Sequence, residues 1–161
     1  MDIESKKILA KGLLEGYVGK SIRGANLRAG FELQTSDYEG PGGKYHDEWM
    51  ADYNGGGQEL TITPSGKRAT RVYAGGTLSK EQLKKLGLTK KDVIGKLVYF
   101  VNKLGDKTRL DENAQAIEGD WAYTYQVLRS VQEIPLDLGS EEIKYKDSLV
   151  FVHFHILSPI R

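Results

Sequence analysis

The segment from Leu149 to Leu157, LVFVHFHIL, constrains the fold more than any other part of the chain. It is short, bounded by polar residues and rich in β-branched and aromatic side chains, which favours a strand. Its period-two faces are both apolar: one carries Val150, Val152, Phe154 and Ile156, the other Leu149, Phe151 and Leu157. A strand of this kind is typical of a sheet interior. We therefore expect residues 149–157 in the middle of a sheet that is covered on both sides.

Two helices are predicted to provide cover on one face of this sheet. Residues 4–17 carry apolar side chains at helical spacing and end at Gly16 and Gly19. Residues 89–104 begin with Thr89 and Asp92, an approximate capping box, and continue as an amphipathic helix. A shorter helix is predicted from Ser79.

Glycine and proline divide the remainder of the first half into strands and one irregular stretch. Residues 44–53, 58–63 and 69–74 are strand candidates separated by GGG and PSGK, which predicts an antiparallel meander. Residues 20–43 contain many glycines and polar residues and are predicted to be an irregular loop. Such a loop serves as a lid or a binding edge, or it is a plain mobile excursion.

The second half repeats this order. Strands are predicted over 120–128, 131–134 and 141–145, ahead of 149–157, and residues 105–119 are predicted to be irregular. The fold class is then α+β, with an antiparallel twisted sheet of about six or seven strands and two main helices on one face.

The length of 161 residues predicts one domain, residues 1–161. Its halves, 1–78 and 79–161, each run through a helix, a polar loop and three strands, and each first strand carries aromatic residues at alternate positions. This favours an internal repeat of two αβββ units. The alternative is that two unrelated three-strand meanders look alike because such meanders have few ways to differ.

Composition excludes several classes of function. Lys and Arg number 23 and Asp and Glu 22, so no overall field draws the chain to nucleic acid or anionic lipid. The absence of cysteine excludes disulfides, thiol nucleophiles and cysteine metal sites. No apolar run approaches the roughly 20 residues that cross a bilayer, and no signal-like segment is recognisable. We expect a cytoplasmic protein without a membrane partner.

The candidate site follows from the strand that begins at Tyr45. Tyr45, Asp47 and Trp49 share one period-two face, where an unpaired carboxylate would be costly. Arg71 and Tyr73 share one face of the third strand, so we expect Asp47 to contact Arg71. With Glu59 on the second strand, the candidate ligand-binding residues are Tyr45, Asp47, Trp49, Glu59, Arg71 and Tyr73. We expect them on the sheet face that the helices leave open.

Three functions are compatible with this site. Aromatic walls around two carboxylates and a guanidinium favour a small-ligand-binding module for an unidentified small molecule, with no cofactor. One alternative is a hydrolase or lyase that uses Asp47 and Glu59 as acid and base, with or without a metal at His153 and His155. The other is a structural or protein-interaction domain in which the same residues form a buried network. A homodimer is compatible with each.

His153 and His155 project from one face of a strand, a spacing that can offer two imidazoles to one metal. His46 is the only other histidine, although an Asp or Glu could replace it as the third ligand. Two packed histidines satisfied by hydrogen bonds are the commoner arrangement, so the pattern does not favour a metal site.

Two sequences that look like binding motifs do not meet the requirements of those motifs. GLLEGYVGKS lacks the first glycine of a phosphate loop, because Leu14 occupies that position. The helices in SKEQLKKLG and LTKKDVIGKL are spaced as in a helix-turn-helix, but the second is too apolar to read a DNA groove. Nucleic acid is not an expected partner.

The motifs YHDEW, GQEL and RVYAGG, followed by GSEEI and VFVHF as a second copy, cover most of the chain. This pattern resembles an uncharacterised prokaryotic domain family that occurs alone or attached to helix-turn-helix regulators. The resemblance implies a fold and carries no activity. The present chain differs from the attached members in having no helix-turn-helix of its own.

Overall fold

The computed structural model describes residues 1–19, 23–50 and 52–161. Its helices are α1 (Ile3–Gly12), which continues as a π-helical turn over Leu13–Tyr17, α2 (Lys80–Lys85) and α3 (Lys90–Leu104), followed by a 3₁₀ turn over Gly105–Lys107. Its strands are β1 (Arg23–Arg28), β2 (Phe31–Gly40), β3 (Gly43–Trp49), β4 (Asn54–Ile62), β5 (Arg68–Thr77), β6 (Ala114–Glu118), β7 (Trp121–Val131), β8 (Leu136–Tyr145) and β9 (Ser148–Ile160).

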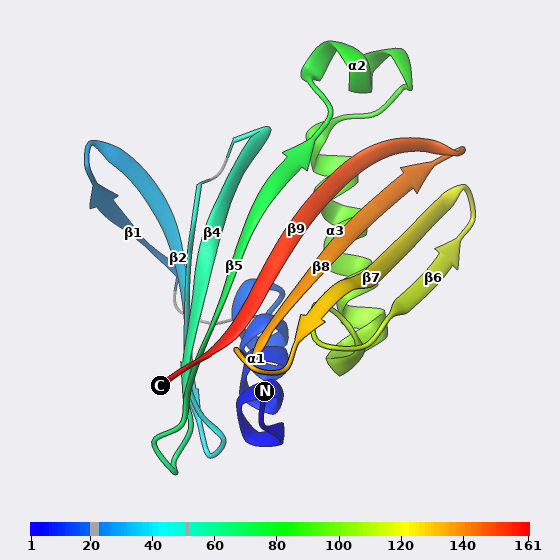
Figure 1. The fold of residues 1–161 in the computed structure, drawn as a ribbon. Coiled ribbons are helices and arrows are strands. Elements are labelled where there is room, and N and C mark those ends of the chain that lie inside the picture. The colour runs from blue at the N-terminus through cyan, green and yellow to red at the C-terminus, as the bar shows by residue number, and fades with distance from the viewer. Residues whose placement is uncertain (20–22, 51) are drawn as a thin grey trace.

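All nine strands found among the described residues form one antiparallel sheet in the order β1-β2-β3-β4-β5-β9-β8-β7-β6 (Figure 1). The predicted α+β class and antiparallel sheet are confirmed, although the sheet is larger than the six or seven strands expected. Strands β2 to β5 and β6 to β9 form two meanders that meet where β5 pairs with β9, with Tyr73 opposite His155.

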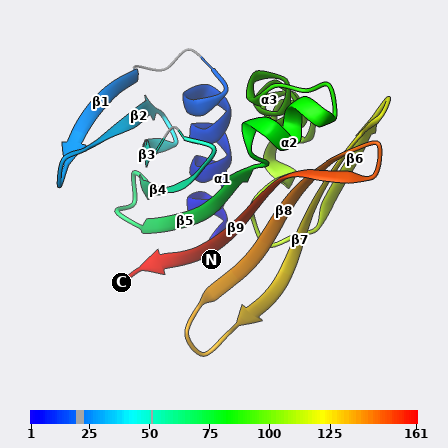
Figure 2. The same ribbon diagram turned by 90° about the horizontal axis from the view of Figure 1, so that it is seen from above.

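Helices α1 and α3 lie on the same side of the sheet, which curves around them (Figure 2). Helix α1 is capped by Asp2, whose side chain accepts a hydrogen bond from the backbone N–H of Ser5. Helix α3 begins with the predicted capping box of Thr89 and Asp92. None of the helices in the described ranges combines the length and apolar character needed to span a membrane.

The core lies between these helices and the sheet. One cluster includes Val93, Leu97 and Phe100 of α3 packed with Tyr123 and Phe151, and a second includes Leu9 and Ala10 of α1 packed with Tyr45, Ala69 and Leu157. Each helix therefore covers its own part of the sheet, since apolar burial is the main force that holds a helix on a sheet.

The expected irregular loop over 20–43 is wrong for its described part, because residues 23–40 form the hairpin of β1 and β2. Residues 20–22 lie outside the described residues. The hairpin turns at Ala29 and Gly30, both with positive φ. Half of the β2 residues are exposed, and its two buried residues, Thr35 and Ser36, are polar. The segment therefore lacks the apolar alternation that reveals a strand.

The second half contains two similar corrections. Residues 114–118, predicted to be irregular, form the short strand β6 at the other edge of the sheet. Residues 132–135 form the turn between β7 and β8, where a strand over 131–134 was predicted. The Pro135 in this segment cannot donate to a strand ladder, which explains why the chain turns here.

Strand β9 lies between β5 and β8, as predicted for the segment 149–157. The prediction that both of its faces are covered is wrong. Phe151, His155 and Leu157 are buried beneath the helices, whereas Phe154 is 51% exposed and Ile156 is 41% exposed on the opposite face. The described residues thus leave this outer face of the sheet open.

Candidate functional site

A cavity of about 270 Å³ lies between α3 and the strands β3, β5 and β9. Its walls include the aromatic and aliphatic side chains of Tyr17, Trp49, Tyr53, Leu97 and Phe151. Its polar lining residues include Asp47, Tyr73, Arg109 and His153. The cavity is on the helix-covered side of the sheet, so the expectation that the candidate site lies on the open face is wrong. The aromatic residues around Asp47 need the helices as packing partners.

The opposite face of β3 has a different character. His46 lies 2.6 Å from an oxygen of Asp37 and 3.1 Å from an oxygen of Glu48. These groups are partly exposed and pair with one another in a polar surface cluster. The predicted division of β3 into an aromatic face and a polar face is therefore confirmed. The prediction of which face the helices cover is wrong.

Beneath the cavity, Glu59 and Arg71 form a fully buried ion pair. Arg71 Nη2 donates to Glu59 Oε1 at 2.6 Å, and Arg71 Nε donates to Oε2. The Tyr45 hydroxyl donates to the same Oε1 at 2.8 Å. Burial opposes ionisation of Glu59, but the charge and hydrogen bonds of Arg71 prevail and lower its pKa. The arrangement holds three strands together.

Asp47 is 2% exposed and accepts a hydrogen bond from the Tyr73 hydroxyl, at 3.0 Å from its Oδ1. Burial, and then the negative charge of Glu59, raise its pKa to about 8. The predicted contact between Asp47 and Arg71 is wrong. Glu59 lies opposite Asp47 on one side and opposite Arg71 on the other, so it stands between them and takes the guanidinium.

The six candidate residues lie together on one face of the sheet, but they divide into two groups. Asp47, Trp49 and Tyr73 line the cavity. Tyr45, Glu59 and Arg71 lie below it and do not line it. Only the first group can contact a ligand in the cavity, while the second supports the sheet.

A second buried carboxylate, Glu141 on β8, was not among the candidates. Arg109 donates to it through Nε and Nη2, at 2.9 Å to Oε1 and 2.9 Å to Oε2, and the Tyr123 hydroxyl donates to Oε1 at 2.7 Å. Burial opposes the ionisation of Glu141, yet Arg109 holds its pKa well below the usual range. This network has the same chemical composition as that of Glu59: one carboxylate, one guanidinium and one phenol.

Arg109 reaches this position from the segment between α3 and β6. Its φ of 59° lies in the left-handed region, which is unfavourable for a residue with a side chain. Its carbonyl accepts from Arg71 Nη1 at 2.8 Å, and the next carbonyl, of Leu110, accepts from Tyr125 at 2.7 Å. These buried bonds compensate for the strained backbone and join the two networks.

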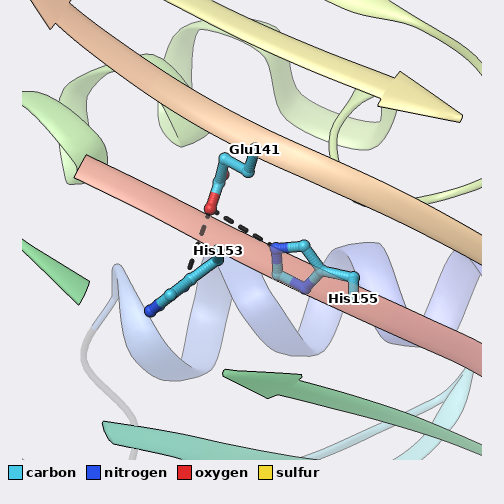
Figure 3. Close-up of side chains that lie close together, drawn as sticks. All are labelled: Glu141, His153 and His155. Atoms are coloured by element: carbon cyan, nitrogen blue, oxygen red, sulfur yellow. Dashed lines mark ion pairs between the residues drawn. The ribbon is translucent and has the colours of Figure 1, made fainter. Parts of the chain in front are cut away.

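Both histidines of β9 lie beside Glu141 (Figure 3). His153 Nδ1 is 3.8 Å and His155 Nε2 is 3.5 Å from Glu141 Oε2. Burial lowers the pKa of His153 to about 3 and also lowers that of His155. Both rings are therefore neutral at pH 7, when a ring nitrogen is available as a ligand.

Sequence reasoning missed Arg109 because it lies in a segment without periodicity. A signal for Glu141 was present, because alternation places Glu141 and the apolar Ile143 on the same face of β8, and Ile143 is buried. His153 is the cross-strand neighbour of Glu141, a relation that appears only once the register is known.

No family model, curated protein or solved structure matches the chain. The resemblance to the prokaryotic domain family therefore stays a prediction, and the proposals below rest on the geometry of the site.

Proposed function

We propose that the chain is a small-ligand-binding module whose site is the cavity between α3 and the sheet. The observation that carries this proposal is the position of the buried Asp47 and Tyr73 pair among aromatic walls. Ligand sites are typically concave, mostly apolar and equipped with a few converging polar groups, and this cavity has each of these features.

The cavity chemistry favours a small polar molecule with a planar or apolar body. Its volume of about 270 Å³ lies near the small end of ligand sites, which suits a metabolite-sized compound. With a pKa of about 8, Asp47 is mostly protonated at pH 7. A neutral carboxyl offers a ligand both a donor and an acceptor, while Trp49 and Tyr53 offer ring faces.

A thermal-shift screen of small polar metabolites tests this proposal. We expect at least one compound to raise the Tm of the wild-type protein, and to lose that effect in Asp47→Ala, which removes both the donor and the acceptor. Asp106→Ala is the matched control, since it is the same substitution at an exposed residue outside the cavity. The proposal fails if no compound stabilises the wild type or if Asp47→Ala responds as the wild type does.

If the protein is a hydrolase or lyase, the structure supports Asp47 better than Glu59 as its acid or base. Both oxygens of Glu59 accept from Arg71, and the residue does not line the cavity. Acid or base chemistry would therefore rely on Asp47, whose raised pKa suits proton transfer near neutral pH. Incubating the screening hits with the protein and following them by NMR distinguishes turnover from binding.

A protein-interaction function is the second candidate, and the open face of the sheet favours it. Leu60, Ile62, Phe154 and Ile156 on this face are each about two-fifths exposed or more. Val72 and Leu138 flank Ile156 in the register and continue the apolar surface. Such a surface can pair with itself across a twofold axis, so a second copy of the chain is the partner that we propose.

Sedimentation over a range of concentrations tests self-association. We expect a dimer that Phe154→Lys dissociates, with Ile134→Lys as a control at an exposed apolar residue in the turn between β7 and β8. A wild-type protein that stays monomeric at high concentration would contradict this second candidate without affecting the cavity.

The prediction that each half is an αβββ unit is wrong, because the described residues place five strands in 1–78 and four in 79–161. We still propose that the two meanders arose by duplication, with residues 1–78 and 79–161 as the copies. Tyr45 and Glu59 correspond to Tyr123 and Glu141 in strand order and in their hydrogen bond. The support is this paired chemistry at equivalent places, which a chance likeness of meanders does not require.

A further inference from the structure

We propose that Glu141, His153 and His155 bind one divalent transition-metal ion, with Zn²⁺ as the representative ion. Two imidazoles and one carboxylate are a common ligand set for Zn²⁺ and for related ions such as Co²⁺. This inference goes beyond the proposed binding of a small molecule and does not depend on it.

The spacing of the ligand atoms fits such an ion. One ligand atom from each residue lies within 4.8 Å of the other two. Glu141 Oε2 is 3.8 Å from His153 Nδ1 and 3.5 Å from His155 Nε2. In a tetrahedral site with bonds of about 2.0–2.1 Å, neighbouring ligand atoms are about 3.4 Å apart. Small side-chain rotations would complete the coordination.

The protein itself leaves these nitrogens without hydrogen bonds. Nδ1 of His153 and both ring nitrogens of His155 are buried and have no hydrogen-bond partner among the described residues. His155 is 1% exposed, so bulk solvent does not reach its ring. Buried polar atoms are normally paired, and a group of unpaired ones that converges on a carboxylate indicates a missing partner.

The carboxylate has the capacity to accept that partner. Oε1 of Glu141 accepts from Arg109 and Tyr123, whereas Oε2 accepts one bond from Arg109. One acceptor position of Oε2 therefore faces the two imidazoles. A histidine N–H could also fill it, but 3.5 Å exceeds the usual N–H···O distance of about 2.7–3.2 Å.

Arg109 adds a positive charge beside the proposed ion, which weakens metal binding. Arg109 also fixes the Glu141 carboxylate through two bonds, as partners of metal ligands commonly do. His153 lines the cavity, so water or an anionic group of a small molecule can reach the ion and offset the added charge. The three protein ligands then leave one position open, as in catalytic zinc sites.

The first test uses the wild-type protein after chelator treatment. Calorimetric titration with Zn²⁺ is expected to give one equivalent bound, and Co²⁺ is expected to produce visible absorption bands. In protein labelled with ¹⁵N-histidine, Zn²⁺ should shift the ring resonances of His153 and His155 and leave those of His46 unchanged. No bound metal, or a response of His46 alone, would overturn the proposal.

The second test uses variants. His153 borders the cavity, so His153→Ala removes a ligand at the least enclosed position of the three. We expect it to weaken Zn²⁺ binding at least a hundredfold, since losing only a partner of a metal ligand costs about 10–100-fold.

His46→Ala is the matched control, because it alters the one histidine outside the cluster. Wild-type affinity in His153→Ala would overturn the proposal. If His153→Ala fails to fold, the ¹⁵N-histidine spectra of the wild type decide the question.

Discussion

Glu59 and Glu141 are both fully buried, and both accept bonds from a tyrosine hydroxyl and an arginine fork. They differ in the source of the arginine. Arg71 is the cross-strand neighbour of Glu59, whereas Arg109 reaches Glu141 from the segment that precedes β6.

This difference determines what each half can do. In the first half the strand position opposite the carboxylate is occupied by the guanidinium, and the network is structural. In the second half Arg109 performs that role from outside the sheet, so the position opposite Glu141 is available to His153. The second half thereby gains two ring nitrogens that the first half lacks.

The largest expected effect comes from removing the strand arginine. Arg71→Met leaves Glu59 buried without its counter-charge, and breaking a buried pair in this way costs about 3–5 kcal/mol. Urea unfolding measures the change in the free energy of unfolding. A loss below about 1 kcal/mol would show that Glu59 does not depend on Arg71.

Arg109→Met should be less damaging than Arg71→Met. The two imidazoles beside Glu141 can take up a proton and partly replace the lost charge, so we expect a loss near the lower end of about 3–5 kcal/mol. The loss should shrink at low pH. The same urea experiment at pH 5.5 and 7.5 checks this, and a loss greater than that of Arg71→Met would break the comparison.

A further effect is expected from the titration of Asp47. Its pKa is raised to about 8 from an ordinary value of 3.8, so the folded state binds the proton more tightly than the unfolded state. The contribution of protonated Asp47 to the stability of the fold is complete below pH 4, and it is lost as the pH rises to about 8.

Asp47→Asn should remove that loss, so its advantage in Tm over the wild type should grow from pH 5 to pH 8. The difference isolates Asp47, because His153, with a pKa lowered to about 3, contributes in the opposite direction in both proteins. An advantage that is equal at both pH values would indicate an ordinary carboxylate.

The smallest effect is expected from removal of metal. The core clusters and both arginine networks are formed by protein groups alone, so chelator-treated protein should stay folded. Adding Zn²⁺ should raise the Tm by a few degrees, as expected for a ligand that binds only the folded state. Unfolding on chelation would mean that the ion is structural.

Periodic elements could be predicted from the sequence, whereas edge strands could not. Helix α3, the meander β3 to β5 and the inner position of β9 follow from apolar repeats and capping residues. Strands β1 and β6 lie at the sheet edges and are largely exposed, so their side chains need not alternate. The open outer face of β9 was missed because Phe154 and Ile156 are apolar despite their exposure.

For the candidate site, the sequence predicts which residues of a strand share one face. Alternation correctly grouped Tyr45, Asp47 and Trp49. Pairing was not predictable, because register decides that Glu59 stands between Asp47 and Arg71. The contribution of Arg109 depends on one left-handed backbone conformation in an irregular segment, for which periodicity gives no signal.

Anomalous diffraction from crystals grown with Zn²⁺ tests the difference between the two halves most directly. We expect one strong peak between Glu141, His153 and His155, and no peak beside Glu59. A peak at the surface cluster of His46 alone, or no peak next to Glu141, would contradict this expectation.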